Sequence, residues 1–144
     1  MSTRTTIGGA GKDAFRWELR SDLAALAELR ARLRDFLARQ AVSSAAAADV
    51  ILSLQEAAKN AMRASGGRPV RVTVWIRRDT VNVCVRDHGA GFSLSAPRRC
   101  PRVWQTGGRG LYVMRTLMDS VEIDCSDGAM VLMRRRLSST AAAA

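Results

Sequence analysis

The spacing of apolar residues changes repeatedly along this chain, and this succession limits the possible fold more than any other feature. Apolar and charged residues alternate from Phe15 to Leu19, a period of two that is typical of a half-buried strand. Ser21 and Asp22 then mark the start of a helix that should run to about Gln40. Its apolar stripe comprises Leu23, Leu26, Leu29, Leu33, Phe36 and Leu37. We interpret the stripe as core, with a surface for a partner helix as the alternative.

A second helix is predicted from Ser43 or Ser44 to about Ala64, where the following serine and two glycines end it. Its buried stripe consists of Val50, Leu54, Ala57 and Ala61. A second stripe, pointing roughly the opposite way, holds Glu56, Asn60 and Arg63. These three residues stand at positions i, i+4 and i+7, so their functional groups should converge on one side of the helix.

The second half of the chain predicts two hairpins separated by a loop and a short helix. Alternating valines in residues 70–85 indicate an antiparallel hairpin that delivers Asp87 at its end. Residues 92–106 hold prolines and arginines without periodicity, and we interpret them as a flexible lid. A helix over residues 110–118 then precedes a hairpin that turns at Asp127-Gly128.

The predicted element order is β-α-α-β-β-α-β-β, with no internal repeat and no linker that would divide it. Such an order favours an α/β (α+β) fold, a two-layer sandwich in which helices cover one face of a mixed, mostly antiparallel sheet. The length of 144 residues and the apolar content of 47% suffice for a single core. We expect one domain over residues 14–137, between a flexible N-terminus at residues 1–13 and a disordered tail at residues 138–144.

The formal net charge of +10 suits an anionic partner such as a nucleotide, a nucleic acid or an acidic protein surface. The charge is almost entirely arginine and is scattered through every element, so a solvated surface is the simpler explanation. A direct nucleic-acid contact is disfavoured, because no basic groove-entering helix and no aromatic stacking platform are evident.

The cysteines Cys84, Cys100 and Cys125 are odd in number and far apart, which indicates neither a disulfide framework nor a zinc site. We therefore expect reduced thiols. The N-terminus lacks an apolar run of signal-peptide length, and no segment reaches the length of a membrane span. These features predict a soluble, cytoplasmic protein without a membrane partner.

Three polar or glycine-bearing segments, in this order, outline a nucleotide site. The stripe on the second helix offers a general base in Glu56, a neutral metal ligand in Asn60 and a cation in Arg63. The segment Asp87-His88-Gly89-Ala90-Gly91 adds a carboxylate that can bind a base. The segment Gly107-Gly108-Arg109-Gly110-Leu111 adds backbone amides that can hold phosphates.

The same segments resemble the Bergerat-type ATP-binding domain shared by gyrase, histidine kinases and MutL-type proteins. Within that superfamily the chain is most similar to the bacterial anti-sigma factor serine/threonine kinases of the partner-switching type. Glu56-Ala57-Ala58-Lys59-Asn60-Ala61 resembles the E-A-x-x-N-A motif, and Asp87-His88-Gly89-Ala90-Gly91-Phe92 resembles D-x-G-x-G followed by an apolar residue. Gly108-Arg109-Gly110-Leu111 resembles G-x-G followed by an apolar residue. The resemblance covers about residues 15–137.

The resemblance implies a role for each matching position at the base and at the metal. Asp87 would accept the adenine amino group, and Gly89 and Gly91 would let the backbone approach the base. Asn60 would bind Mg²⁺ through its amide oxygen, a hard ligand for a hard ion. Glu56 would take the proton from the attacking hydroxyl.

The resemblance also assigns the phosphate end of an ATP or ADP molecule. The amides of Arg109, Gly110 and Leu111, preceded by Gly108, would open a helix onto the phosphates. Arg63 could add charge stabilisation during transfer, as could the arginines of the lid.

The function implied by the resemblance combines an enzyme and a regulator. Such a kinase would use Mg-ATP to phosphorylate a STAS-domain anti-anti-sigma protein and would sequester an RNA polymerase sigma factor, as a homodimer. The alternative is a regulatory module that binds nucleotide and protein partners without kinase activity.

The chain departs from the family pattern at two places. Ala64 stands where many relatives have a histidine, and Ala129 and Met130 stand where they have a threonine after the last hairpin glycine. The second change removes a hydroxyl near the adenine. His88 is the only histidine and is interpreted as a loop residue. Because no phospho-accepting histidine helix precedes the domain, a sensor histidine kinase is disfavoured.

Overall fold

The computed structural model describes residues 13–87, 108–125 and 128–137. The described elements appear in the predicted order. They are β1 (Phe15–Leu19), α1 (Leu23–Arg39), α2 (Ser44–Ala64), β2 (Val70–Arg77), β3 (Thr80–Arg86), α4 (Arg109–Leu117), β4 (Ser120–Asp124) and β5 (Met130–Arg136). The expected lid at residues 92–106, residues 1–12 of the expected flexible N-terminus and the expected tail at residues 138–144 lie outside the described residues.

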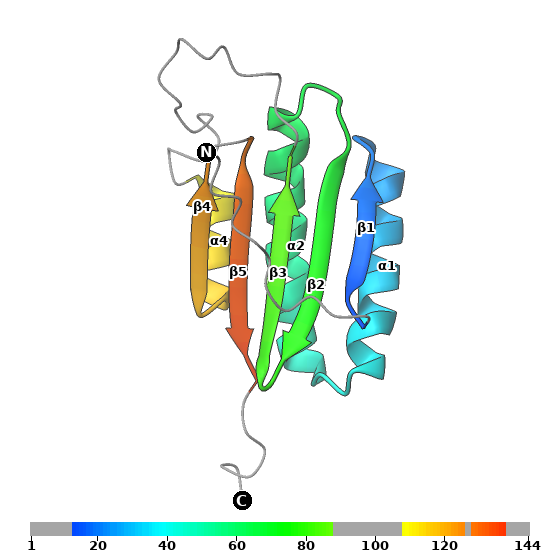
Figure 1. Cartoon of the computed structure of the whole chain (residues 1–144), viewed down its shortest axis with the longest axis vertical. Coiled ribbons are helices and arrows are strands. Elements are labelled where there is room, and N and C mark those ends of the chain that lie inside the picture. The colour runs from blue at the N-terminus through cyan, green and yellow to red at the C-terminus, as the bar shows by residue number, and fades with distance from the viewer. Residues whose placement is uncertain (1–12, 88–107, 126–127, 138–144) are drawn as a thin grey trace, which may run out of the picture.

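The five strands form one sheet in the order β1-β2-β3-β5-β4, and the helices lie on one face of it (Figure 1). The two-layer α+β architecture is therefore confirmed. The sheet was expected to be mixed, but every pairing between the described strands is antiparallel. The difference arises because β5 lies between β3 and β4, which run in the same direction and would be parallel if they were neighbours.

The core lies between the helices and the strand residues that face them. Val74, Val83 and Met133 are fully buried partners in one cross-strand row of that face. The helix starts predicted from sequence are real N-caps, since the Asp22 carboxylate accepts a hydrogen bond from the Ala25 amide at 2.6 Å. The Ser43 hydroxyl caps α2 in the same way.

The predicted apolar stripes of α1 and α2 form this core, with one exception. The buried members are Leu26, Leu29, Leu33, Phe36, Leu37, Val50, Leu54, Ala57 and Ala61. Leu23 was expected in the stripe of α1, but its side chain is 81% exposed. Leu23 is the first residue of the helix. The period of a helix tells which side is apolar, but it does not tell where the helix end leaves the core.

The face of the sheet that the helices leave uncovered carries a second, small apolar cluster of Trp75, Cys84 and Met130. Burial raises the pKa of the Cys84 thiol to about 11, although the nearby Arg86 acts in the opposite direction. Cys84 is free. Cys125, directly after β4, is disulfide-bonded, so the expectation of reduced thiols is confirmed for Cys84 and wrong for Cys125. In the described part of the chain, no helix is long and apolar enough to cross a bilayer.

Candidate functional site

The described parts of the three predicted site segments lie at one end of the molecule. Asp87 directly follows β3, and the second half of α2 ends beside it at the same end of the molecule (Figure 1). The helix α4 begins at that end and runs back along the sheet toward the start of β4 (Figure 1). Residues that are far apart in the sequence therefore share one end of the two-layer fold.

The junction between α2 and α4 brings the proposed base and metal ligand against the first turn of α4. A Cβ atom at Gly110 would lie 3.3 Å from Glu56 Oε2 and 3.4 Å from Asn60 Nδ2. Contacts of that length leave little room for a side chain. The glycine therefore lets the start of α4 pack directly on the two polar residues of α2.

Asn60 differs from the sequence expectation, which placed its stripe opposite the core. Its side chain is only 6% exposed, because α4 packs on this side of α2. An amide buried at a helix junction is held in position and offers one hard oxygen ligand. Arg63 lies in the last turn of α2 and is exposed, so the stripe is divided between a buried part and a solvated end.

Glu56 is partly accessible, with a side chain that is 23% exposed. Its Oε1 atom lies 3.7 Å from the ammonium of Lys59, while Oε2 is the atom nearest to Gly110. Lys59 is 36% exposed, so solvent screens the ion pair. The pair therefore orients the Glu56 carboxylate but adds little to the stability of the fold. The sequence motif gave no reason to single out Lys59.

Asp87 is bonded to the residue that directly precedes β5, and only 1% of it is exposed. Its backbone amide donates to the Ala129 carbonyl at 2.9 Å, and the Ala129 amide donates to Asp87 Oδ1 at 3.1 Å. Both contacts use the backbone of Ala129. The replacement of the family's threonine therefore leaves this support intact, although it removes the hydroxyl.

Gly128, which the sequence analysis interpreted only as part of a turn, lies directly against Asp87. It has a φ of +72°, and a Cβ atom there would lie 2.6 Å from the carbonyl oxygen of Asp87. Real Cβ atoms do not approach that closely, so Gly128 is required for the contact between the hairpin end and Asp87. The available signal was the family motif itself, in which a glycine precedes the threonine position.

The phosphate-binding segment forms the N-terminus of α4. Gly108 is the N-cap and makes no side-chain capping bond, and the first intrahelical bond runs from the Tyr112 amide to the Gly108 carbonyl at 3.2 Å. The amides of residues 109–111 precede that bond, so they can be offered to an anion. Arg109 is exposed, whereas the Leu111 side chain is 1% exposed and anchors the turn in the core.

These groups fit an adenine nucleotide with a magnesium ion. A fixed carboxylate, a buried amide oxygen and a glycine-bearing helix start are the donors and acceptors that such a ligand needs. The predicted backbone contacts at Gly89 and Gly91, together with His88, lie outside the described residues.

Comparisons with known proteins agree with this arrangement. The pattern of the histidine kinase-like ATPase domain family matches residues 19–135. The chain is 30% identical over 105 residues to the serine-protein kinase RsbW of Bacillus pumilus (strain SAFR-032), covering 62% of this chain and 65% of that protein's length.

Among solved structures, the RsbU and RsbW domains of Rv1364c from Mycobacterium tuberculosis superpose with a TM-score of 0.66 at 20% identity. The superposition covers 86% of this chain and 32% of the other, and it shows a shared fold. The family match runs from the last residue of β1 into β5 and contains all three polar segments. The chain therefore belongs to the histidine kinase-like ATPase domain family.

Proposed function

We propose that the protein is an anti-sigma factor and serine/threonine protein kinase. It uses Mg-ATP to phosphorylate a STAS-domain anti-anti-sigma protein, and it sequesters an RNA polymerase sigma factor by partner switching. Membership of an ATPase family and the similarity to a serine-protein kinase support the proposal. As part of the same proposal, the protein acts in the cytoplasm as a homodimer, without a direct nucleic-acid or membrane contact.

The observation that carries the proposal is the packing of Gly110 against Glu56 and Asn60. It places a carboxylate, an amide and the start of a helix within one small region. In phosphoryl transfer most of the catalysis is positioning and charge stabilisation, so such a convergence is what the reaction needs.

Each group then has one task. Glu56 accepts the proton of the attacking serine or threonine hydroxyl while that oxygen bonds to the γ-phosphorus and the bond to ADP breaks. The magnesium ion, when bound, neutralises charge on the phosphates, and Asn60 would hold it. The amides of residues 109–111, which follow the N-cap Gly108, hold phosphate oxygens. Arg63, in the last turn of α2, adds positive charge during transfer.

Asp87 selects the adenine base, and the backbone at Gly89 and Gly91 approaches the adenine ring. A carboxylate accepts a hydrogen bond from the adenine amino group and cannot pair with the carbonyl that guanine has there. The two backbone contacts with Ala129 keep the Asp87 carboxylate in a fixed orientation.

The second candidate is a regulatory module that binds nucleotide and protein partners without transferring phosphate. It is favoured by one observation, the alanine at position 129, which contacts Asp87 through its backbone amide and has no hydroxyl. In that case Asp87 and the start of α4 would be needed to bind nucleotide, and Glu56 would have no catalytic role.

The test is phosphate transfer from labelled ATP to a candidate antagonist encoded by a neighbouring gene. Glu56→Gln should keep ATP affinity and slow transfer by about 10²–10⁴-fold, because a base acts in the transfer step. Asn60→Ala should impair both nucleotide binding and transfer, because it removes the metal ligand. Glu28→Gln, on the exposed side of α1, is the matched control.

A sigma-factor pull-down run beside this assay separates the two candidates. Capture of a partner with bound ADP or ATP, but no transfer to any neighbouring-gene antagonist by the wild-type protein, would exclude the kinase and leave the regulatory module.

A further inference from the structure

The open face of the sheet, opposite the described helices, is buried where a bare face should be solvated (Figure 1). One face of an antiparallel sheet commonly meets water and is polar. On this face, however, Trp75, Asn82, Cys84 and Met130 are between 2% and 9% exposed. Neighbours within a sheet contact the flanks of a side chain, so burial this complete indicates a further layer. The four side chains are buried within the single chain, so we infer that the layer belongs to it.

The four residues form a diagonal band across three strands. Trp75 on β2 and Asn82 on β3 are partners in one cross-strand row. Cys84 belongs to the next row of this face, and Met130 on β5 belongs to the row after that, opposite Arg86. The exposed residues on either side of the band are Arg16, Glu18, Arg71 and Glu122. So narrow a band indicates one crossing segment rather than a broad protein surface.

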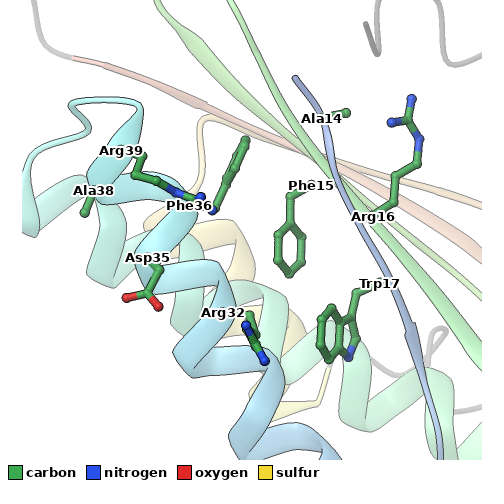
Figure 2. A pocket seen from close by; sticks show the side chains of 9 residues that line it. All are labelled: Ala14, Phe15, Arg16, Trp17, Arg32, Asp35, Phe36, Ala38 and Arg39. Carbon is green, nitrogen blue, oxygen red and sulfur yellow. The ribbon is translucent and has the colours of Figure 1, made fainter. Parts of the chain in front are cut away.

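The band begins beside Ala14. Phe15 pairs with Val74, so Ala14, one residue earlier, reaches the level of Trp75, and it packs against the small apolar cluster on this face. Figure 2 shows Phe15 pointing toward α1, whereas Ala14 points away from it. The chain that leads into β1 therefore arrives on the open face, at the start of the band.

Residues 1–12, which precede Asp13 and Ala14, are long enough for the crossing. From Ala14 to Met130 the band covers three strand spacings and about four residues along the strands, a distance of about 20 Å. Residues 1–12 can reach at most about 40 Å. They include one branched apolar residue, Ile7, followed by two glycines, which allow a backbone to lie close to a surface.

The tail at residues 138–144 fits the band less well. The Leu137 amide donates to the Asp79 carbonyl, so the tail starts beside the turn between β2 and β3. Arg77 and Arg136, which lie at that end of the sheet, are exposed. The tail also contains only serine, threonine and alanine, so it has no large apolar side chain to place on the cluster.

We propose that residues 1–12 cross the open face along this band as an intramolecular strap, with Ile7 against the apolar cluster. The strap buries Cys84, which is a free thiol. It also closes the open face to other proteins, so a partner that uses this face must first displace the strap.

The test measures how fast N-ethylmaleimide alkylates Cys84 in the folded chain, read from the mass of the peptide that contains this residue. Deletion of residues 1–12 should raise the rate at least about tenfold, because a buried thiol reacts only when reagent reaches it. Deletion of residues 138–144 is the control and should leave the rate unchanged. A synthetic peptide of residues 1–12, added to the truncated chain, should restore slow alkylation in a saturable way.

Point variants of the full chain locate the contact. Ile7→Asp should raise the alkylation rate of Cys84 nearly as much as the deletion. Thr6→Asp is the matched control, because it adds the same charge at the neighbouring position, and successive residues of an extended segment face opposite sides. The synthetic peptide that carries Ile7→Asp should not protect the truncated chain.

An unchanged rate after deletion of residues 1–12 would overturn the proposal, since other side chains would then cover Cys84. A rise on deletion of the tail alone, or equal effects of Ile7→Asp and Thr6→Asp, would also overturn it. Alkylation of the wild type that slows as the protein concentration rises would assign the face to a second copy instead. Because no nucleotide takes part, the outcome is independent of the kinase proposal.

Discussion

At the scale of single residues, the position of Asp87 depends on Gly128, a neighbour that has no functional group. Gly128 combines a left-handed backbone with a contact that excludes any Cβ atom. A side chain at this position would both strain the backbone and push against the carbonyl of Asp87. Gly66 separates the two effects, because it has a φ of +63° but nothing within 4 Å of its Cβ position.

Gly128→Ala should therefore destabilise the fold by about 2–4 kcal/mol, against about 1–2 kcal/mol for Gly66→Ala. Only Gly128→Ala should also weaken ADP binding, because it displaces Asp87. Urea unfolding and calorimetry measure the two effects. Equal losses of stability in the two variants, with ADP affinity unchanged, would remove Gly128 from the site.

The buried thiol of Cys84 predicts a pH dependence of stability. Its pKa is about 11 in the folded protein, compared with 9.0 for an ordinary thiol, because burial disfavours the thiolate. Between these values the thiol ionises only in the unfolded chain, so its stabilising contribution is full below pH 9.0 and is lost as the pH rises toward about 11. The loss should be on the order of 2–3 kcal/mol.

The measurement compares unfolding free energies of the wild type and Cys84→Ala across this range. The difference between them should stay constant below pH 9.0 and shrink toward about pH 11. Parallel curves over the whole range would show that burial does not raise the pKa of Cys84.

At the scale of elements, the helices and hairpins could be predicted because their signals are local. The caps at Asp22 and Ser43 and the valine alternation of β2 and β3 each need only a few neighbouring residues. The insertion of β5 between β3 and β4 could not be predicted, because strand order depends on contacts between distant segments. The burial of Asn60 could not be predicted either, for the same reason. Its stripe on α2 is polar, and it is buried only because α4 packs on it.

The contact between α2 and α4 predicts opposite effects on stability and activity. Gly110→Ala should keep or raise stability by about 1 kcal/mol, because alanine favours a helix. It should also slow phosphate transfer by roughly tenfold or more, because the Cβ atom displaces Glu56 and Asn60 by a few tenths of an ångström.

The control is Thr116→Ala, which also raises helix propensity in α4 but alters an exposed residue whose hydroxyl bonds to the Tyr112 carbonyl. Transfer should be unaffected in this variant. If Gly110→Ala transfers phosphate as fast as the control, the α2–α4 contact does not position the reacting groups.

An ion pair between α2 and β5 should stabilise the fold. Arg135 Nε and Nη2 lie 3.2 and 3.1 Å from Asp49 Oδ2, and the two side chains are only 21% and 29% exposed. Asp49→Ala should destabilise the fold by about 1–3 kcal/mol, because it leaves a partly buried guanidinium without this partner.

Glu28→Ala is the comparison for that variant, since it breaks a 4.0 Å pair with Arg32 between side chains that are 57% and 61% exposed. Its cost should stay within about 0.5 kcal/mol. Equal costs in urea unfolding would mean that burial adds nothing to the Asp49 pair.

At the scale of the whole molecule, the proposed site joins segments from α2, from the end of β3 and from the start of α4. A ligand that needs all of them binds the folded state and not the unfolded chain. The free energy of unfolding must then rise with ligand concentration. The net charge of +10 complicates this test, because any triphosphate is attracted to the protein.

The final prediction separates specific binding from attraction by charge. Mg-ATP at a hundredfold excess over its dissociation constant should stabilise the fold by about 2.7 kcal/mol, a shift in Tm on the order of 10 °C. Mg-GTP carries the same charge but presents a carbonyl to Asp87, so its shift at equal concentration should be several-fold smaller. Asp87→Asn should reduce the ATP shift and leave the GTP shift nearly unchanged. If both nucleotides raise the Tm equally in the wild type, the +10 charge explains the binding and Asp87 does not select the base.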